Sequence, residues 1–419
     1  MAPGLPPHPA SGLDTLKAAG LEAVKALASA GQQFAIRSGG HTQYPGANNI
    51  DNGVTIDLGL MKWTRYKPES ETVDVGPAGR WRDVYAELRP HERVVAGGRE
   101  GGVGFAGMLL GGGNTFLTAR LGCACDNVLA YETGGSSNFG IVTNFTLRAI
   151  ENDEVWGGLA IFPKLVSAQA AEALPRFNDI VVDDVDSNLL TLYTYMDVVV
   201  VAMYAQVAGI PRAPSYPEWP TLPGVATTYK QISITEMAAE YNLPTGYYNT
   251  WFTADFLNDT RIVSHAVHEH EGLVGRLKVR ILGGDFITQC LFQPLPAIFA
   301  QQAIESGGGG NVLGLERQSE NALMWLAAIM VRTPEQEKFA YEEAQGWVQR
   351  VREFAATIPG GNQEWEYLNY ADGSQDPLAS YGPTNAQKLR EVSGKYDPQQ
   401  VFQRFARGGF KIATSSIAK

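Results

Sequence analysis

The sequence predicts an α+β fold of two domains, and three observations lead to that prediction. At 419 residues the chain exceeds the usual length of one domain, which is about 100 to 200 residues. Hydrophobic residues make up 44% of the chain and charged residues 18%, as in globular proteins with a packed core. Near residue 151, short strands with glycine corners give way to long strands that alternate with long helices. We therefore expect a first domain at residues 1–152, a second at 153–364 and a distinct C-terminal segment at 365–419.

The first domain is expected to open with a helix and to continue in short strands. Residues 13–30 are rich in alanine and leucine at helical spacing and end at Gly31, which is typical of a helix with a glycine stop. A short helix is expected at residues 80–88, closed by Pro90. Apolar and β-branched runs predict strands at residues 34–36, 54–58, 72–75 and 141–150.

Longer elements are expected in the second domain. Strand-like runs lie at residues 155–162, 189–195, 198–206 and 321–331. Helix-like runs alternate with them at residues 165–177, 259–277 and 334–356. This alternation predicts an antiparallel sheet covered by helices on one face, with a proline-rich loop at residues 211–223. In the C-terminal segment we expect a helix at residues 385–396, ended by Asp397 and Pro398.

Charge and cysteine content argue against several kinds of partner and of stabilising site. The formal net charge is −11 and no basic stripe is present, so nucleic acid and anionic membranes are poor partners. Three cysteines are too few for a disulfide framework or a four-thiolate zinc site. We expect no metal site at His265, His268 and His270, which we interpret as a solvated helix surface. We expect neither a secretory signal nor a membrane span, and the sequence leaves localisation and oligomeric state undetermined.

A histidine turn follows the first expected strand. Arg37 and Ser38 precede Gly39, Gly40 and His41, so two glycines allow a sharp turn in front of an imidazole. An imidazole in this position can be joined covalently to a cofactor, or act as an acid or a base. A purely structural histidine in a turn is the alternative interpretation.

Glycines are concentrated between residues 97 and 113. The window includes Gly98, Gly104, Gly107, Gly111, Gly112 and Gly113. So many glycines lose conformational entropy on folding unless the backbone approaches something closely, and adjacent amides can form an anion-binding nest. The histidine turn and the glycine window together favour a nucleotide cofactor held by backbone groups and one imidazole. A glycine-rich surface loop is the alternative interpretation.

A third polar group lies near the C-terminus, at Tyr367, Asn369 and Tyr370. We expect a loop or short strand here, in which successive side chains point to opposite faces. A tyrosine hydroxyl can act as a general base if its pKa is lowered, and an asparagine amide can hydrogen-bond the edge of a heterocycle. Core packing of the two tyrosines is the alternative.

Taken in order, these motifs resemble those of the berberine-bridge-enzyme-like, FAD-linked oxidoreductases, and in particular their fungal members. The resemblance extends over about residues 33–412. It is carried by Arg37-Ser38-Gly39-Gly40-His41, Leu110-Gly111-Gly112-Gly113, Cys125-Asp126-Asn127-Val128, Asn138-Phe139-Gly140-Ile141-Val142-Thr143, Tyr367-Leu368-Asn369-Tyr370 and Lys395-Tyr396-Asp397-Pro398.

The resemblance implies a role for each part of the chain. Residues 1–152 would form an FAD-binding domain of the vanillyl-alcohol oxidase (PCMH) type, residues 153–364 a substrate domain, and residues 365–419 a segment that packs back on the FAD-binding domain. It implies FAD joined covalently to His41, with Tyr370 as the catalytic base. The loop Gly98 to Gly104 has no cysteine, so at most that one covalent link is expected. The other cofactor-binding residues implied are Arg37, Ser38, Gly39, Gly40, Gly98, Gly104, Gly107, Gly111, Gly112, Gly113, Gly140, Ile141, Val142 and Asn369.

The implied activity is oxidation of a small organic substrate, expected in secondary metabolism. A proton would leave the substrate, a hydride would pass to the flavin, and dioxygen would reoxidise it. The expected partners are therefore a small-molecule substrate and dioxygen. Some relatives oxidise sugars in an open groove, and Trp219, Trp251 and Trp325 are candidates for lining such a groove or for the core.

The chain departs from the family pattern in two places. After Glu132 it passes directly through residues 133–140, where relatives have a further hairpin and a tryptophan-containing helix, and the family's opening strand before residue 13 is absent. Losing a paired strand leaves backbone groups unpaired and a core face uncovered. The alternative prediction is therefore a flavin-poor or flavin-free relative that acts as a non-redox cyclase or isomerase, or as a binding protein.

Overall fold

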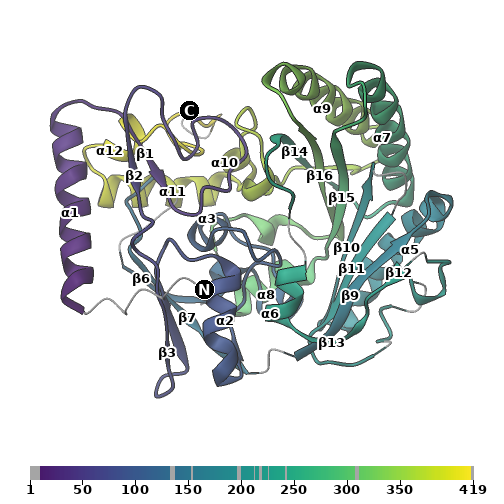
Figure 1. Ribbon diagram of the computed structural model, residues 1–419, viewed down its shortest axis with the longest axis horizontal. Helices are drawn as coiled ribbons and strands as arrows, with labels where there is room; N and C mark the ends of the chain where they lie inside the picture. Colours follow the sequence, from purple (N-terminus) through teal and green to yellow (C-terminus); the bar gives the residue numbers. More distant parts are fainter. Residues whose placement is uncertain are drawn as a thin grey trace.

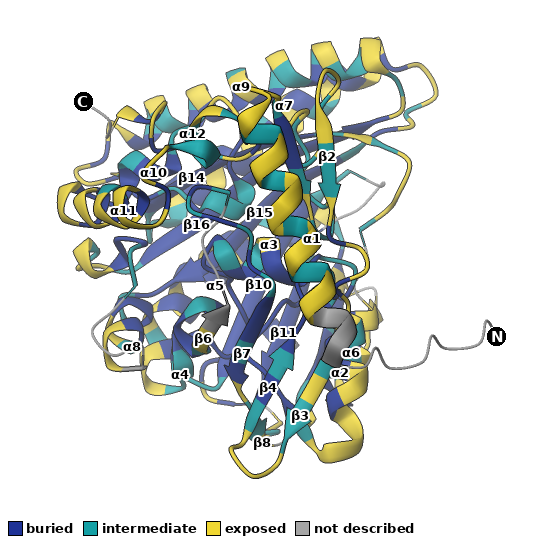
Figure 2. Ribbon diagram, turned by 90° about the vertical axis from the view of Figure 1, so that its left-hand side faces the viewer, coloured by how far each residue is buried: buried dark blue, intermediate teal, exposed yellow. Residues whose placement is uncertain are grey.

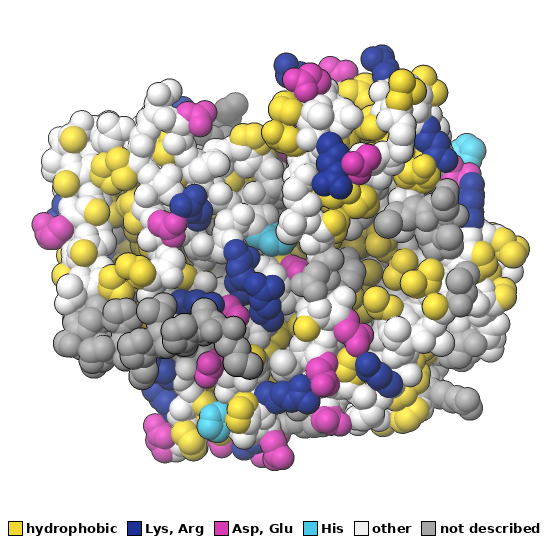
Figure 3. Space-filling model, in the orientation of Figure 1, with side chains coloured by type: hydrophobic (Ala, Val, Ile, Leu, Met, Phe, Trp, Pro, Cys, Tyr) yellow, Lys and Arg dark blue, Asp and Glu magenta, His cyan; other side chains and the backbone are white. Residues whose placement is uncertain are grey.

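The computed structural model of this chain describes residues 10–132, 137–151, 154–195, 200–211, 213–216, 219–224, 226–240, 243–306 and 311–416. The direct connection expected after Glu132, without the hairpin and helix of relatives, falls largely on residues 133–136. These residues lie outside the described ones. Within the described part, no helix is both long and apolar enough to span a bilayer. Lys, Arg, Asp and Glu side chains are interspersed over the face drawn in Figure 3.

The larger half of the molecule is built on a nine-stranded sheet (Figure 1). Its strands follow the order β12-β9-β11-β10-β15-β16-β14-β17, with β13 also paired to β9, and every pairing is antiparallel. The strands are β9 (Glu154–Phe162), β10 (Ser187–Thr194), β11 (Val200–Gln206), β12 (Ala226–Thr227), β13 (Lys230–Ser233), β14 (Tyr248–Leu257), β15 (Ile287–Leu295), β16 (Ala322–Val331) and β17 (Asn362–Gln363).

Three long helices cover one face of this sheet (Figure 1). They are α5 (Ser167–Ile180), α7 (Thr260–Arg280) and α9 (Pro334–Ala355). Trp325 and Trp347 are fully buried in the core between the sheet and these helices. All ten residues of β16 are buried, so its opposite face is covered as well, by the smaller half of the chain. Figure 2 shows buried strands inside and exposed outer faces on the helices.

The smaller half has a four-stranded antiparallel sheet in the order β3-β4-β7-β6. These strands are β3 (Thr64–Lys67), β4 (Thr72–Val75), β6 (Val128–Glu132) and β7 (Asn144–Arg148). Two short pairs accompany the sheet, β1 (Phe34–Arg37) with β2 (Val54–Asp57), and β5 (Arg93–Val94) with β8 (Ile150–Glu151). The helices of this half are α1 (Ala10–Ser29), α2 (Trp81–Leu88), α3 (Phe105–Leu110) and α4 (Thr118–Leu121).

The end of the chain lies beside its beginning. After α8 (Ile298–Ser306), the last helices are α10 (Pro377–Ser380), α11 (Pro383–Tyr396) and α12 (Val401–Arg404). The amide of Phe34 in β1 donates to the carbonyl of Phe405 at 2.9 Å, and the amide of Arg407 donates to the carbonyl of Phe34 at 3.2 Å. Figure 1 shows the yellow C-terminal helices next to β1 and β2.

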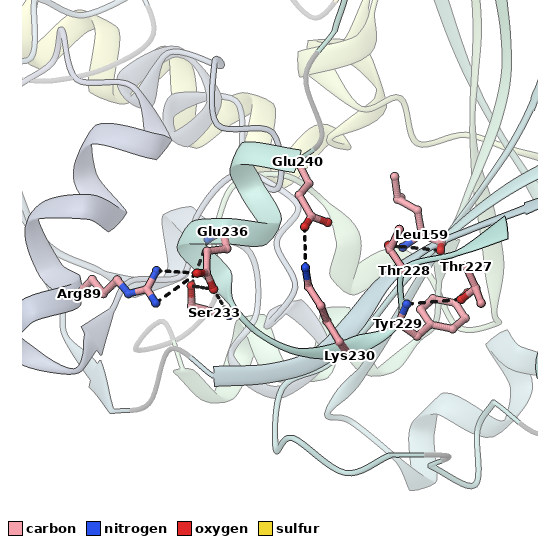
Figure 4. A network of polar contacts seen from close by, with 9 residues as sticks. All are labelled: Arg89, Leu159, Thr227, Thr228, Tyr229, Lys230, Ser233, Glu236 and Glu240. Atoms are coloured by element: carbon pink, nitrogen blue, oxygen red, sulfur yellow. Dashed lines mark hydrogen bonds and ion pairs between the residues drawn. The ribbon is translucent and has the colours of Figure 1, made fainter.

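A polar network joins the two halves next to the glycine window (Figure 4). Helix α6 (Ile234–Glu240) begins at Ser233, whose hydroxyl donates to Glu236 and accepts from the amide of Glu236. Arg89, just after α2, lies 3.3 Å from Glu236, and Lys230 pairs with Glu240 at 3.1 Å. The amide of Gly101 donates to the carbonyl of Ala238 at 2.9 Å, so α6 holds the glycine window directly.

The α+β prediction is confirmed, and the long periodic elements lie close to their predicted positions. Some strands of the structure were not predicted from the sequence. β14 and β15 are missing from the prediction although they lie in the middle of the large sheet. Both are buried along most of their length, so they lack the alternation of apolar and polar residues that marks a half-exposed strand.

Candidate active site

A large cavity lies between the smaller half and the face of the nine-stranded sheet opposite the helices. The space within its lining and open mouth is about 1800 Å³. Its walls come mainly from residues 36–48, 98–110, 137–142 and 367–371, from Asn114, and from strands β10, β11, β14, β15 and β16. Segments from the whole length of the chain converge here, which makes the cavity the candidate binding site.

The histidine turn forms one wall of the cavity and packs closely against the glycine window. A Cβ atom on Gly39 would lie 2.3 Å from the Cα of Gly104, so the two backbones are in direct contact. Gly40 has φ of +66°, a left-handed conformation that favours glycine. Arg80 connects the same two loops by donating to the carbonyls of Gly39 and Gly102. The turn is therefore glycine-rich because the backbone of another loop lies against it.

The imidazole of His41 faces a carboxylate. His41 Nε2 lies 3.6 Å from Glu100 Oε2, and the exposed fractions of these side chains are 32% and 10%. The other carboxylate oxygen of Glu100 accepts from the amide of Gly102 at 2.9 Å. Oε2 is buried and has no hydrogen-bond partner within the described part of the chain. The carboxylate of Glu100 therefore lies near the Nε2 side of the imidazole without a hydrogen bond to it.

The glycines of the window differ in what they contact. A Cβ on Gly98 would meet the ring of Trp81, so this glycine allows the loop to cross a buried indole. A Cβ on Gly107 would meet no atom within 4 Å, although Gly107 lines the cavity. Gly107 therefore keeps open a space that any side chain would begin to fill.

The glycine run at residues 111–113 lies outside the cavity lining. A Cβ on Gly111 would lie 2.0 Å from Asn369 Oδ1, one on Gly112 would meet Leu313, and one on Gly113 would meet Ala124. The amides of Gly111 and Gly112 donate to helix carbonyls at the end of α3. These three glycines allow close packing of other segments, and the predicted anion nest is not formed by these two amides.

Arg37 also lies outside the lining. Its Nη2 is 2.7 Å from Asp57 Oδ2 at the protein surface. This hydrogen bond holds the pKa of Asp57 below its usual value. Arg37 therefore joins the ends of β1 and β2 across their shared register.

Gly140, Ile141 and Val142 line the cavity on a loop held by the C-terminal segment. Asn138 donates to the carbonyl of Phe410 at 3.0 Å, and the ammonium of Lys411 donates to the carbonyl of Ser137. Burial lowers the pKa of Lys411 to about 7, with Asp397 opposing the shift. The end of the chain thus positions one wall of the cavity.

Tyr370 contributes its phenol to the opposite end of the cavity. The amide nitrogen of Gln293 on β15 donates to Tyr370 Oη at 2.9 Å. Gln293 Oε1 accepts in turn from Arg99 Nη2, and from Asn114 Nδ2 at 3.1 Å. These two donors fix the amide orientation, so the nitrogen of Gln293 is turned toward the phenol. The phenol oxygen of Tyr370 thus accepts a hydrogen bond from an amide whose own oxygen is bound by a guanidinium.

Asn369 and Tyr367 hold the turn that carries Tyr370. Asn369 Nδ2 donates to the carbonyl of Met108 at 2.9 Å and to Tyr367 Oη at 3.0 Å. Burial raises the pKa of Tyr367 well above its usual value, so its hydroxyl stays neutral. Residues 368–370 form a 3₁₀ turn within a loop, so of the two alternatives the loop is right and the extended strand is wrong. All three side chains consequently lie at the cavity lining rather than on opposite faces.

The sheet supplies an apolar wall with one tryptophan. Leu190, Met203, Leu291 and Leu326 line the cavity from four neighbouring strands. Trp251 on β14 lies between His41 and Tyr370 in the contact network, because its ring centre lies 6.3 Å from that of His41 and 5.9 Å from that of Tyr370. Trp219 and Trp325, the other two tryptophans considered for a groove, are at most 1% exposed and belong to the core.

The cavity thus brings together most of the residues predicted from the sequence. The predicted residues in its lining are Ser38, Gly39, Gly40, His41, Gly98, Gly104, Gly107, Gly140, Ile141, Val142, Asn369 and Tyr370. Sequence reasoning missed Arg99, Glu100 and Gln293. The alternation of Gln289, Leu291 and Gln293 was an available signal, since these positions share one face of a strand.

The histidines of α7 need one correction. His270 is 5% exposed, bonds Thr288 Oγ1 through Nε2 at 2.7 Å and stacks on Trp347, so it is not on a solvated surface. Burial lowers the pKa of His270 to about 3. His265 stacks on Phe354. No group of three or more metal-ligating side chains occurs among the described residues.

The residues of the cavity fit a large planar heterocycle with a nucleotide tail. Gly107 leaves room beside the backbone, and an apolar wall faces it across the cavity. Glu100 Oε2 is a buried acceptor without a hydrogen-bond partner among the described residues, next to an imidazole with a free nitrogen. Such a lining can hold a flavin.

Residues 17–133 match the family model described as an FAD binding domain. The FAD-dependent monooxygenase drtC of Aspergillus calidoustus is 34% identical over 415 residues, which cover 92% of this chain and 78% of the relative. The chain belongs to the berberine-bridge-enzyme-like FAD-linked oxidoreductases. FAD is therefore its cofactor, and the smaller half carries the FAD-binding domain.

Solved structures and a further relative agree with this family. The bifunctional solanapyrone synthase of Alternaria solani is 29% identical, with 91% of this chain and 77% of the relative covered. The 6-hydroxy-D-nicotine oxidase of Arthrobacter nicotinovorans has a TM-score of 0.74 at 18% identity, covering 92% of this chain and 88% of that one. The Physcomitrella patens protein BBE-like 1 has a TM-score of 0.70 at 16% identity, covering 91% and 87%. These two structures show that the fold is of the PCMH type.

Proposed function

We propose that this flavoprotein oxidises a small organic substrate of secondary metabolism, with Tyr370 as the proton acceptor and dioxygen as the final electron acceptor. One observation carries the proposal. The phenol of Tyr370 and the imidazole of His41 face one cavity, on either side of Trp251, and the phenol oxygen accepts a hydrogen bond from Gln293. The names of the fungal relatives support the redox class.

His41 is the residue that would hold the flavin covalently. Its Nε2 faces Glu100, so the proposed attachment is through Nδ1. Glu100 would keep the ring in the orientation that presents this nitrogen. The backbones around Gly39, Gly104 and Gly107 would lie against the cofactor, and Ile141 and Val142 would cover it from another side. Bound there, FAD supplies a two-electron acceptor that dioxygen can return to the oxidised state.

Tyr370 would take the substrate proton at its phenol oxygen. To take a proton the phenol must first be ionised, and Gln293, to which Arg99 donates, would stabilise that phenolate by donating to its oxygen. The leucine-rich sheet wall would exclude water and hold the carbon skeleton of the substrate. Proton abstraction and orientation are thus the tasks of this chain's own side chains.

The first test is the absorbance of the purified protein, before and after acid precipitation. We expect flavin bands in the native protein and flavin retained in the precipitate. In His41→Ala the precipitate should lose its flavin, while the native variant still takes up added FAD through the remaining walls. A protein that is colourless and does not take up FAD would refute the proposal and favour the non-redox alternative.

The second test uses reoxidation. Dithionite-reduced protein mixed with dissolved dioxygen should regain its flavin bands and produce hydrogen peroxide stoichiometrically. A reduced protein that is stable in air would contradict dioxygen as the acceptor, even if FAD is bound.

A further inference from the structure

Arg99 is a buried cation, and no acidic side chain pairs with it among the described residues. Its side chain is 8% exposed and lines the cavity. Nη1 donates to Asn188 Oδ1 at 3.3 Å and Nη2 donates to Gln293 Oε1. Both acceptors are neutral amides. No ion pair with Arg99 occurs among the residues that the structure describes.

The neighbouring carboxylate is turned away from this guanidinium. Glu100 uses one oxygen for the amide of Gly102 and directs the other toward His41. Arg99 and Glu100 are the only Lys, Arg, Asp or Glu residues of the described chain in the cavity lining. A guanidinium taken out of water without a counter-charge is costly, and such a charge persists where a ligand supplies the missing anion.

The position of Arg99 indicates what kind of ligand would supply the missing anion. Through Gln293 it is connected to Tyr370, the proposed proton acceptor, whereas His41 lies across the ring of Trp251. The cation is therefore at the end of the cavity where the substrate would react. Next to it, Gln289 lines the cavity, and no hydrogen bond of its side-chain amide to another described residue is found.

We propose that Arg99 binds an anionic oxygen of the substrate, so that the enzyme takes organic acids, meaning carboxylates or ionised enols and phenols, with their apolar part against the leucine wall. The guanidinium pairs with this oxygen while its amide bonds to Asn188 and Gln293 keep it in place. The inference rests on the proposed function, because it names the substrate class of the same site.

Calorimetric titration of the FAD-loaded protein with benzoate and with its neutral isostere benzamide tests this. We expect benzoate to bind at least about tenfold more tightly than benzamide, as a charge-assisted pair requires. Arg99→Gln should weaken benzoate binding about ten- to hundredfold and change benzamide binding little. Arg99→Lys should retain part of the preference. The matched control is Arg407→Gln, which removes an exposed positive charge outside the cavity lining and should change neither affinity.

A second variant guards against a folding defect in Arg99→Gln. Gln293→Glu places a carboxylate on the same guanidinium and should abolish the preference for benzoate with Arg99 still present. Equal binding of benzoate and benzamide to the parent protein would overturn the proposal, as would no measurable benzoate binding. An equal loss of both ligands in Arg99→Gln would also overturn it.

Two outcomes separate this proposal from others. If Arg99→Gln shifts the reduction potential of the flavin but leaves the benzoate preference intact, the cation serves the reduced cofactor and the substrate proposal is wrong. Flavin content is measured before each titration. A flavin-free protein contradicts the proposed function, whereas a flavin-loaded protein without charge preference contradicts the role of Arg99 alone.

Discussion

Replacing Gly39 by alanine tests whether the histidine turn owes its glycine to close packing. The new Cβ would lie 2.3 Å from the Cα and 3.0 Å from the amide nitrogen of Gly104, whereas ordinary contacts are 3.4–4 Å. The two backbones must therefore separate by about 0.7 Å to reach 3.0 Å, and by about 1.1 Å to reach an ordinary contact of 3.4 Å. Overpacking of this kind costs about 1–3 kcal/mol. The separation would also strain the two hydrogen bonds by which Arg80 joins these loops.

We expect Gly39→Ala to lower the free energy of unfolding by that amount in denaturant titrations and to reduce flavin occupancy. The control is Gly275→Ala in α7, where a Cβ meets no atom within 4 Å, and alanine should stabilise this helix by up to about 1 kcal/mol. Gly107→Ala separates the two effects. Its Cβ meets no protein atom and Gly107 lies in helix α3, so the flavin-free protein should keep or gain stability while flavin binding weakens. Unchanged stability and flavin content in Gly39→Ala would refute the packing account.

Three further predictions concern titratable groups. Tyr370→Phe removes the proton acceptor, so flavin reduction by substrate should slow by about 10²- to 10⁴-fold with the flavin content unchanged; an unaffected rate would exclude this phenol as the base. Burial, reinforced by Glu366, raises the pKa of Asp255 well above its usual value, and both its oxygens lack partners among the described residues. The folded state then holds a proton that the unfolded chain releases near pH 4, so the free energy of unfolding should fall by about 1.4 kcal/mol per pH unit above pH 4, until the folded carboxyl ionises. Chemical denaturation across pH should show this slope, and Asp255→Asn should abolish it, whereas Asp259→Asn should not. Lys411 has the opposite linkage, because burial lowers its pKa to about 7 and the unfolded amine stays protonated to about pH 10. Stability should rise with pH from 7 toward 10, and the same slope in Lys411→Met would contradict this assignment.

Local sequence determined the regular elements and the motif order. The helices at α1, α7, α9 and α11 were predictable because their apolar residues recur at helical spacing or their ends carry glycine and proline signals. The histidine turn was predictable because Gly39, Gly40 and His41 are consecutive. Those motifs also carried the family and its cofactor, both of which the comparisons confirm.

Contacts between distant segments decided the rest. Arg99, Gln293 and Tyr370 are separated by 194 and 77 positions, so no local pattern could join them into one chain of hydrogen bonds. The run at residues 111–113 has the composition of an anion nest, but Asn369, Leu313 and Ala124 pack against it, and only the fold brings those residues there. His270 was misjudged because its burial depends on β15 and α9.

The sequence by itself therefore determined the class of protein and its cofactor, and it named the two residues proposed to react, since all of these are written in short contiguous stretches. The tertiary structure decided which glycines line the cavity, which residues surround the phenol, and that Arg99 has no ion-pair partner among the described residues. The physical reason is that backbone conformation and helix periodicity are set within a few residues. Burial and charge compensation instead depend on side chains that meet only when loops of the smaller half lie against the nine-stranded sheet.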